Sequence, residues 1–232
     1  MRGTSNYPAA GRYGVADLPP VTTSDVGILK STLLPSLTLH SGISTVAYVA
    51  SRVTGRAEVK DWAWPSSQVI NAWWSAVGRH MCHGNVTLTD ALHGLSWTEK
   101  LLLSGVTAWG TRLFYRIVSR SMSRGKDDPR YDELKTKDSG FWNSALYKLF
   151  LPEALFLTFI TLPFTLPFRV PQNATSILMD GNSSSAMRTL GVGLFGAGFA
   201  MEALADCQLE SHRQQKSDLC RHGVWSIVRH PK

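Results

Sequence analysis

Residues 147–170 read YKLFLPEALFLTFITLPFTLPFRV and form the most apolar stretch of the chain. A helix of about 20 residues crosses a bilayer core, so this stretch is long enough to span. Its three prolines, Pro152, Pro163 and Pro167, predict a kink, or a division into a helix and a re-entrant piece. A soluble core would have difficulty burying so aromatic a segment on all sides, which favours a membrane helix.

Four further apolar segments predict additional spans, at residues 31–50, 62–78, 101–118 and 190–205. The last of them is rich in glycine, which is expected to let helices approach closely. Together the five segments predict an all-α fold, a multi-span transmembrane helical bundle with about five spans. The mean hydropathy of −0.07 is low for a membrane protein. It leaves open a soluble helical protein whose apolar stretches are core helices.

Polar residues are concentrated in residues 1–25, 119–140, 171–188 and 207–232. The first of these segments lacks the apolar core of a secretory signal and is expected to be a flexible amino-terminal tail, which leaves residues 26–232 as the transmembrane domain. The second and fourth are rich in Lys and Arg and are predicted to be cytoplasmic, so the third should be lumenal. Possible glycosylation sites at Asn85, Asn173 and Asn182 all fall in loops predicted to be lumenal. We expect an integral membrane protein of the endoplasmic reticulum.

Composition argues against several classes of function. The net charge is +7, but the basic residues form no long run with interleaved aromatic residues, so no nucleic-acid partner is expected. Cys82, Cys207 and Cys220 are too few for a disulfide framework, and none belongs to a C-x-x-C pair. We therefore expect no metal site either.

The last apolar segment carries two acids. Gly191, Gly198, Glu202 and Asp206 follow one another at intervals of seven, four and four residues, which places them along one stripe of a helix. Two carboxylates at this spacing repel each other, and they need cations or a hydrogen-bonding ligand nearby. Arg112 and Arg116 are candidate cations. The competing interpretation is a purely structural ion-pair network.

A third acid, Glu153, lies inside the most apolar stretch, where an ionisable residue is a candidate functional group. Because Lys148 and Pro152 lie close to it in sequence, a role at a helix end is an equal alternative.

Several motifs, taken in order, resemble the steroid 5-alpha reductase-like membrane family, in particular its uncharacterised branch. They are Trp109-Gly110 with Arg112-Leu113 and Arg116, Asp128-Pro129-Arg130-Tyr131, Leu190-Gly191-Val192 with Gly198, Glu202 and Asp206, Gly223-Val224-Trp225, and Arg229-His230-Pro231. The resemblance extends from about the first predicted span to the last residue.

This resemblance implies a transmembrane bundle that binds NADPH from the cytoplasmic side and reduces an activated carbon–carbon double bond of a lipid-soluble substrate. It also implies the cofactor-binding residues, which are Arg112, Gly198, Glu202, Asp206, Arg229 and His230. Arginine suits phosphate, because its planar guanidinium donates paired, charge-assisted hydrogen bonds. No catalytic residue is assigned.

Two departures from the family pattern matter. Trp109 stands where steroid reductases have a tyrosine that polarises the substrate ketone, and an indole cannot supply a phenolic proton, which argues against a 3-keto steroid. Family members also continue past Arg-His-Pro with further helices, whereas this sequence stops at Lys232. We therefore expect an incomplete carboxyl end and weak or absent NADPH binding by the 232 residues.

Two other functions fit the same residues. Membrane methyltransferases of the isoprenylcysteine or phospholipid type also use an Arg-His-Pro segment for their cofactor. A non-catalytic membrane protein or gene fragment is the alternative from another class.

Overall fold

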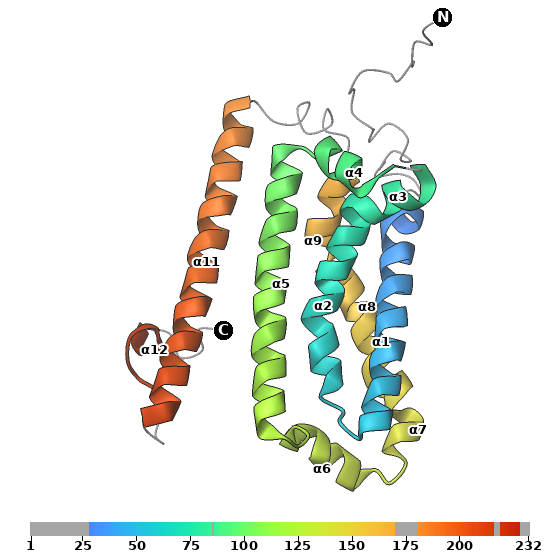
Figure 1. Ribbon diagram of the computed structural model, residues 1–232, viewed down its shortest axis with the longest axis vertical. Helices are drawn as coiled ribbons and strands as arrows, with labels where there is room; N and C mark the ends of the chain where they lie inside the picture. The colour runs from blue at the N-terminus through green and yellow to red at the C-terminus, as the bar shows by residue number, and fades with distance from the viewer. Residues whose placement is uncertain (1–27, 85, 170–180, 216–218, 228–232) are drawn as a thin grey trace, which may run out of the picture. The chain divides into compact units, whose positions relative to one another are not determined.

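The computed structural model describes residues 28–84, 86–169, 181–215 and 219–227, and within these ranges it contains helices and no strand (Figure 1). The all-α class predicted from the sequence is confirmed. The chain divides into two compact units, Met1–Gln172 and Asn173–Lys232, and each is described by itself. The tail predicted at residues 1–25 lies outside the described residues, as do Asn85 and Asn173.

The first unit is built from long helices that run side by side, with short helices at both ends (Figure 1). The long helices are α1 (Leu34–Thr54), α2 (Val59–Trp73), α5 (Trp97–Arg124) and α8 (Leu151–Ile160), which continues into α9 (Leu162–Thr165). The helices α3 (Arg79–Gly84) and α4 (Leu88–Gly94) lie at one end, and α6 (Pro129–Lys137) and α7 (Phe141–Ala145) at the other. Four predicted segments therefore correspond to helices, although their boundaries differ.

Local signals in the sequence explain where the long helices begin and end. Ser96 and Glu99 form a capping box at the start of α5, in which each side chain bonds the backbone amide of the other residue. Gly55 and Gly125 follow the last residues of α1 and α5 with φ of 71° and 68°. Glycine adopts this left-handed conformation without the steric cost that a Cβ atom imposes, so both helices stop there.

The most apolar stretch is bent, as its prolines predict. The helical segments Phe141–Ile160 and Leu162–Phe168 meet at an angle of 48°. Pro163 lies in the first turn of the second segment, where a missing backbone N–H is tolerated, and the bend falls at Thr161. Pro152 lies in the first turn of α8, directly after the π-helical turn Leu146–Phe150.

The helices of the first unit bury polar side chains and expose apolar ones. Helix α1 buries Ser36, His40, Ser44 and Ser51 and exposes Val46, Val49 and Val53. Helix α8 and the residue after it bury Thr158 and Thr161, whereas Leu155, Phe156, Phe159 and Ile160 are exposed. This is the reverse of the pattern of a surface helix in water, whose apolar stripe faces the core.

The second unit contains α11 (Gly181–Gln215) and the short helix α12 (Val224–Ile227). Helix α11 is much longer than the predicted segment 190–205. Within it, Ser185–Gln214 is long and apolar enough to cross a membrane, and the bent pair described above passes the same test if its two parts count as one span. Core helices of soluble proteins can also pass this test, so the multi-span bundle stays a prediction.

Candidate functional site

The acidic stripe predicted on the last long helix lies on α11. Asp206 is buried, with 4% of its surface exposed, and Glu202, one turn earlier, is half-buried. A Cβ atom added at Gly198, one turn before Glu202, would meet no heavy atom within 4 Å. Helix α11 is therefore open at Gly198 among the residues that the structure describes, and the close helix contact expected from the glycines of this segment stays a prediction.

The helix α12 is fixed to α11 directly beside Asp206. The indole Nε1 of Trp225 donates a hydrogen bond of 3.0 Å to the carbonyl oxygen of Ala205, and the backbone N–H of Val224 donates one of 2.9 Å to Oε1 of Gln208. Gly223 has a φ of 61°, and a Cβ atom there would lie 2.4 Å from Nε2 of Gln208. A residue with a Cβ atom would be strained in this left-handed turn, and the end of the Gln208 side chain would have to move aside.

These contacts bring together two of the sequence motifs. Gly223-Val224-Trp225 packs against the part of α11 that carries Asp206, although the sequence separates them by 17 residues or more. Arg229 and His230 lie outside the described residues.

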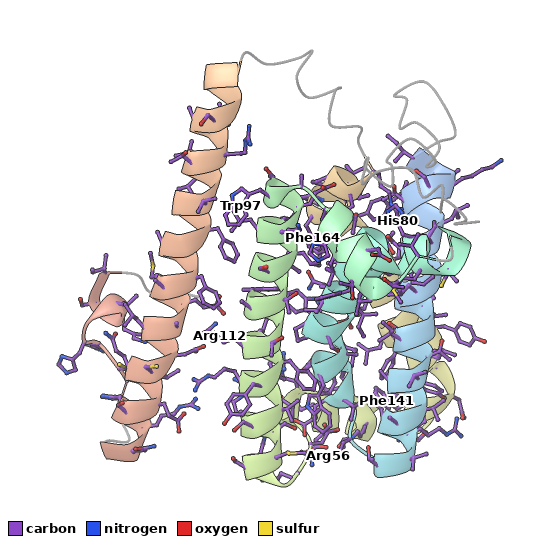
Figure 2. All side chains as sticks on the ribbon, turned by 45° about the horizontal axis from the view of Figure 1, so that its top comes forward. Arg56, His80, Trp97, Arg112, Phe141 and Phe164 are labelled. Atoms are coloured by element: carbon purple, nitrogen blue, oxygen red, sulfur yellow. The ribbon has the colours of Figure 1, made fainter. Side chains whose placement is uncertain are left out.

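The remaining predicted site residue, Arg112, lies midway along α5 in the first unit and is half-buried (Figure 2). The acids belong to the second unit, so their convergence with Arg112 stays a prediction.

A network of ion pairs closes the end of the first unit near α6. The Asp127 carboxylate accepts hydrogen bonds of 2.8 and 3.0 Å from the backbone N–H groups of Ala57 and Glu58, and it pairs with Lys135. Glu58 pairs with Arg56 and with Arg124. The loop between α1 and α2 is thereby attached to the loop between α5 and α6.

Electrostatics shift the pKa of Asp127 in a way that fits this structural role. Burial raises the pKa of the carboxyl, but hydrogen bonds from Lys135 and from the backbone N–H groups of Glu58, Ala57 and Asp128 outweigh it. The pKa of Asp127 therefore lies below its ordinary value, and the carboxylate is charged at neutral pH. The carboxylate oxygens of Asp127 accept hydrogen bonds from the chain itself, so we interpret this network as structural and call it the ionic clamp.

Glu153 belongs to the same end of the bundle. Its carboxylate pairs with Lys60 on α2 rather than with Lys148, the neighbour in sequence considered above. Nearby, the hydroxyl of Tyr131 donates a hydrogen bond of 2.7 Å to Oδ1 of Asp61. Glu153 therefore joins α8 to α2. This ion pair with Lys60 supports a structural role for Glu153 over a functional one.

A second group of polar residues is buried between α1, α2 and the bend after α8. The amide Nδ2 of Asn71 lies 3.2 Å from Oγ of Ser36, 3.2 Å from Nε2 of His40 and 3.1 Å from Oγ1 of Thr161. Ser36 is 2% exposed and the other three residues are fully buried. We call these four residues the His40 cluster.

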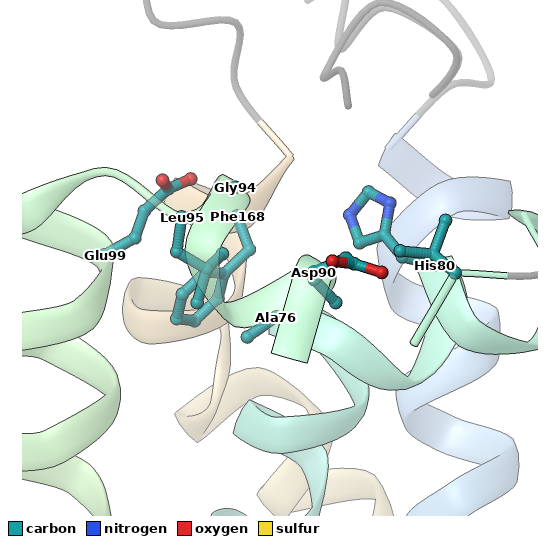
Figure 3. A pocket seen from close by; sticks show the side chains of 9 residues that line it. Ala76, His80, Asp90, Gly94, Leu95, Glu99 and Phe168 are labelled. Atoms are coloured by element: carbon teal, nitrogen blue, oxygen red, sulfur yellow. The ribbon is translucent and has the colours of Figure 1, made fainter. Parts of the chain in front are cut away.

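A small pocket opens at the opposite end of the first unit, beside α3 and α4 (Figure 3). His80 and Asp90 lie on one side and Glu99 on the other, with the apolar side chains of Ala76 and Phe168 between them. Glu99 serves the capping box of α5. Within the described residues, no group of three His, Cys, Asp or Glu side chains could hold a metal ion. The pocket therefore does not provide a metal centre.

Comparison with protein families shows to which family the chain belongs. The model of a family described as "Protein of unknown function (DUF1295)" matches residues 47–232. The chain belongs to this family. DUF1295 is uncharacterised, so membership establishes no activity, and the resemblance to steroid 5-alpha reductase-like proteins stays a prediction. All six predicted cofactor-binding residues fall within the part that matches DUF1295. Searches of curated proteins and of solved structures found no match.

Sequence reasoning missed the His40 cluster. A signal was present, because Ser36, His40 and Ser44 recur every four residues in a segment without charge and so share one face of a helix. Asn71 and Thr161 come from distant segments, and no local pattern indicates that Asn71 meets His40 and Thr161.

Proposed function

We propose that this protein is an integral membrane reductase-like protein that uses NADPH and acts on a carbon–carbon double bond of a lipid-soluble substrate. The observation that supports this most is the attachment of Gly223-Val224-Trp225 to α11 beside Asp206. The resemblance implies that Asp206 and the pair Arg229-His230, which follows this motif in sequence, serve one cofactor. A motif attached beside Asp206 and followed so closely by Arg229 is consistent with a shared nucleotide site.

The residues around this contact have the chemistry that a nicotinamide dinucleotide needs. Carboxylates such as Glu202 and Asp206 accept hydrogen bonds from ribose hydroxyls or from a carboxamide. Phosphates need cations, which Arg229, His230 and Arg112 would supply. The open surface at Gly198 leaves room for a ligand to approach the helix. NADPH would supply the hydride, and the protein would bind and orient both reactants.

The proton donor of such a reaction is not Trp109. Its ring packs edge-to-face against Trp64 with the ring centroids 5.8 Å apart. An indole N–H donates a hydrogen bond but does not protonate a substrate at neutral pH. The substrate is therefore proposed only as a class, a lipid-soluble molecule with an activated double bond, and no catalytic residue is named.

The polarity of the first unit supports a bundle that spans a membrane several times. Exposed Val, Leu and Phe side chains on α1 and α8 surround buried Ser, Thr and His side chains. In hydrocarbon, small and polar residues hold helices together and apolar residues face the lipid. The ionic clamp gathers basic residues at one end, as expected of a cytoplasmic side. Endoplasmic reticulum is the membrane we propose.

A competition experiment tests the proposed cofactor. The protein in lipid nanodiscs is titrated with NADPH, NADH and S-adenosylmethionine, and binding is followed by saturation-transfer NMR, which detects weak complexes. We expect weak, saturable binding of NADPH that Asp206→Asn and Arg229→Ala reduce. Binding of S-adenosylmethionine with the same dependence would instead support the methyltransferase, and NADPH binding that neither substitution changes would contradict a cofactor site at these residues.

A further inference from the structure

Two basic side chains near the end of α5 have no partner in the chain. Arg120 and Lys126 are exposed, and neither side chain makes a hydrogen bond or an ion pair with the residues that the structure describes. The backbone carbonyl oxygen of Lys126 accepts a hydrogen bond of 3.4 Å from Nη2 of Arg56, so the position of this residue is fixed although its ammonium group is free. Both charges are therefore available to a partner outside the chain.

The acids at the same end of the first unit already have cations of their own. Asp127 pairs with Lys135, Glu58 with Arg56, Asp128 with Arg124, Asp61 with Arg130 and Glu153 with Lys60. These carboxylates are thus engaged elsewhere, and the end of α5 presents an excess of positive charge.

Exposed aromatic residues indicate the depth of these charges in a bilayer. Helix α5 exposes Trp97 at its first residue (Figure 2) and Tyr115 further along, with 76% and 69% of their surfaces accessible. The two residues are eighteen positions apart, or about 27 Å at about 1.5 Å per residue, which is close to the roughly 30 Å of a hydrocarbon core. Trp and Tyr are enriched at the two boundaries of that core, so we expect these two residues to mark them.

The two cations then lie at and beyond the level of the lipid headgroups. Arg120 follows Tyr115 by five positions, which places its backbone about 7.5 Å outside the hydrocarbon core. The headgroup region begins at that boundary and is roughly 5–7 Å deep on each side of a bilayer. Lys126 lies further out, after the left-handed turn at Gly125 that ends α5, and its flexible stem lets the ammonium group reach back toward the headgroups.

We propose that Arg120 and Lys126 bind the headgroup of an anionic phospholipid, such as phosphatidylserine, at the cytoplasmic surface of the membrane. The guanidinium of Arg120 would bind the phosphate through paired hydrogen bonds, and the ammonium group of Lys126 would bind the outer negative group of the same headgroup. The inference rests on the proposed function only in that α5 spans a membrane, and it does not involve NADPH.

The surroundings favour a lipid over a soluble anion. Because both cations are exposed to water, a soluble phosphate gains little from pairing with them. A lipid is held at the depth of Arg120 by its own acyl chains, so it meets both cations at a high effective concentration. Each basic residue near an anionic leaflet strengthens association roughly fivefold. The two together should give a clear preference for an anionic headgroup over a zwitterionic one.

A matched pair of double variants tests this site. Arg120→Gln with Lys126→Gln removes the two proposed cations, and Lys30→Gln with Lys137→Gln removes two other exposed charges. Each protein is placed in nanodiscs that contain photoactivatable phosphatidylserine or phosphatidylcholine, with a diazirine on the acyl chain near the glycerol. After irradiation and digestion with chymotrypsin, whose cleavage sites these substitutions leave unchanged, mass spectrometry measures the lipid attached to residues 115–126.

We expect phosphatidylserine to label this segment of the wild-type protein several-fold more than phosphatidylcholine. The preference should fall by up to roughly fivefold for each cation removed in the Arg120 and Lys126 variant, and the control variant should keep it. Equal labelling by the two lipids in the wild-type protein, or the same preference in both double variants, would overturn the headgroup site alone. Labelling of the first unit by neither lipid would overturn the membrane-spanning bundle of the proposed function and this site with it.

Two further conditions separate a lipid from a soluble anion. Raising the salt from about 0.1 M to about 1 M shortens the Debye length from about 10 Å to about 3 Å, so the preference for phosphatidylserine should fall. An excess of inorganic phosphate at constant ionic strength should leave the labelling in place, because phosphate has no acyl chain to hold it at the surface. A preference that salt does not change, or labelling that phosphate abolishes, would overturn the assignment.

Discussion

The indole nitrogen of Trp225 donates a 3.0 Å hydrogen bond to the carbonyl oxygen of Ala205, the residue directly before Asp206. One bond thus connects a motif near the end of the chain to the acidic stripe of α11. The acceptor is a backbone carbonyl inside α11, which moves less than a side chain would. The bond therefore fixes the position of the indole ring relative to the helix axis. We regard this contact as the centre of the proposed cofactor site.

Gly223→Ala should release α12 from α11. At a φ of 61° a Cβ atom costs roughly 1–2 kcal/mol, and it would also displace the side chain of Gln208, which accepts the hydrogen bond of the Val224 amide. Hydrogen exchange of the Val224 amide should then become roughly tenfold faster. Gly198→Ala is the matched control, because its Cβ meets nothing within 4 Å in a helix, and it should leave the exchange rate unchanged. Equal exchange rates in the two variants would contradict this role of Gly223.

Asn71→Leu should destabilise the first unit. It removes the amide that joins Ser36, His40 and Thr161 and leaves buried polar groups without partners, at a cost of roughly 1–3 kcal/mol for each group left unpaired. Thermal unfolding in detergent, followed by circular dichroism, measures the loss. Thr45→Val is the control, because Thr45 is exposed and its hydroxyl bonds only the preceding turn of its own helix. A midpoint for Asn71→Leu as high as that of the control would show that the cluster contributes nothing.

Acid should weaken the ionic clamp through Asp127. Its pKa is lowered in the folded protein, so its contribution to stability is complete above the ordinary carboxyl pKa of 3.8 and is lost as the pH falls from there through the folded pKa. Asp127→Asn should lose stability at neutral pH and respond less to acid below pH 4. Glu133→Gln is the control, because the pair of Glu133 with Lys137 is exposed. Parallel pH profiles for wild-type protein and Asp127→Asn would refute this role.

Single cysteines should reveal the membrane face of the first unit. In a background without Cys82, Cys207 and Cys220, cysteines at Val49 and Phe156 should resist a charged thiol reagent in nanodiscs, although both positions are exposed in the folded chain. A cysteine at Arg130 should react from the cytoplasmic side and one at Asn173 from the opposite side. Rapid labelling at Val49 and Phe156 would favour a water-soluble fold.

The sequence predicted the helices well because their signals are local. The prolines of the most apolar stretch indicated its bend, and the spacing of Glu202 and Asp206 placed them on one face of α11. The short helices α3 and α4 were missed, since they lie in a segment with no sustained periodicity.

Contacts between distant segments could not be predicted in the same way. The pairing of Glu153 with Lys60, rather than with Lys148, depends on α8 packing beside α2. The contacts of Asn71 with His40 and Thr161 likewise depend on the packing of helices that are distant in sequence. Such contacts depend on how the helices pack, and local patterns in a single sequence do not predict that packing.

A double-mutant cycle on NADPH affinity tests the central claim most directly. Trp225→Phe keeps an aromatic ring and removes the N–H that bonds Ala205, and Asp206→Asn removes the neighbouring charge. If both residues hold one cofactor, the double variant should lose less affinity than the product of the two single losses, with a coupling of at least about 0.5 kcal/mol. Independent effects that multiply, or no effect of either substitution on NADPH binding, would contradict a shared site.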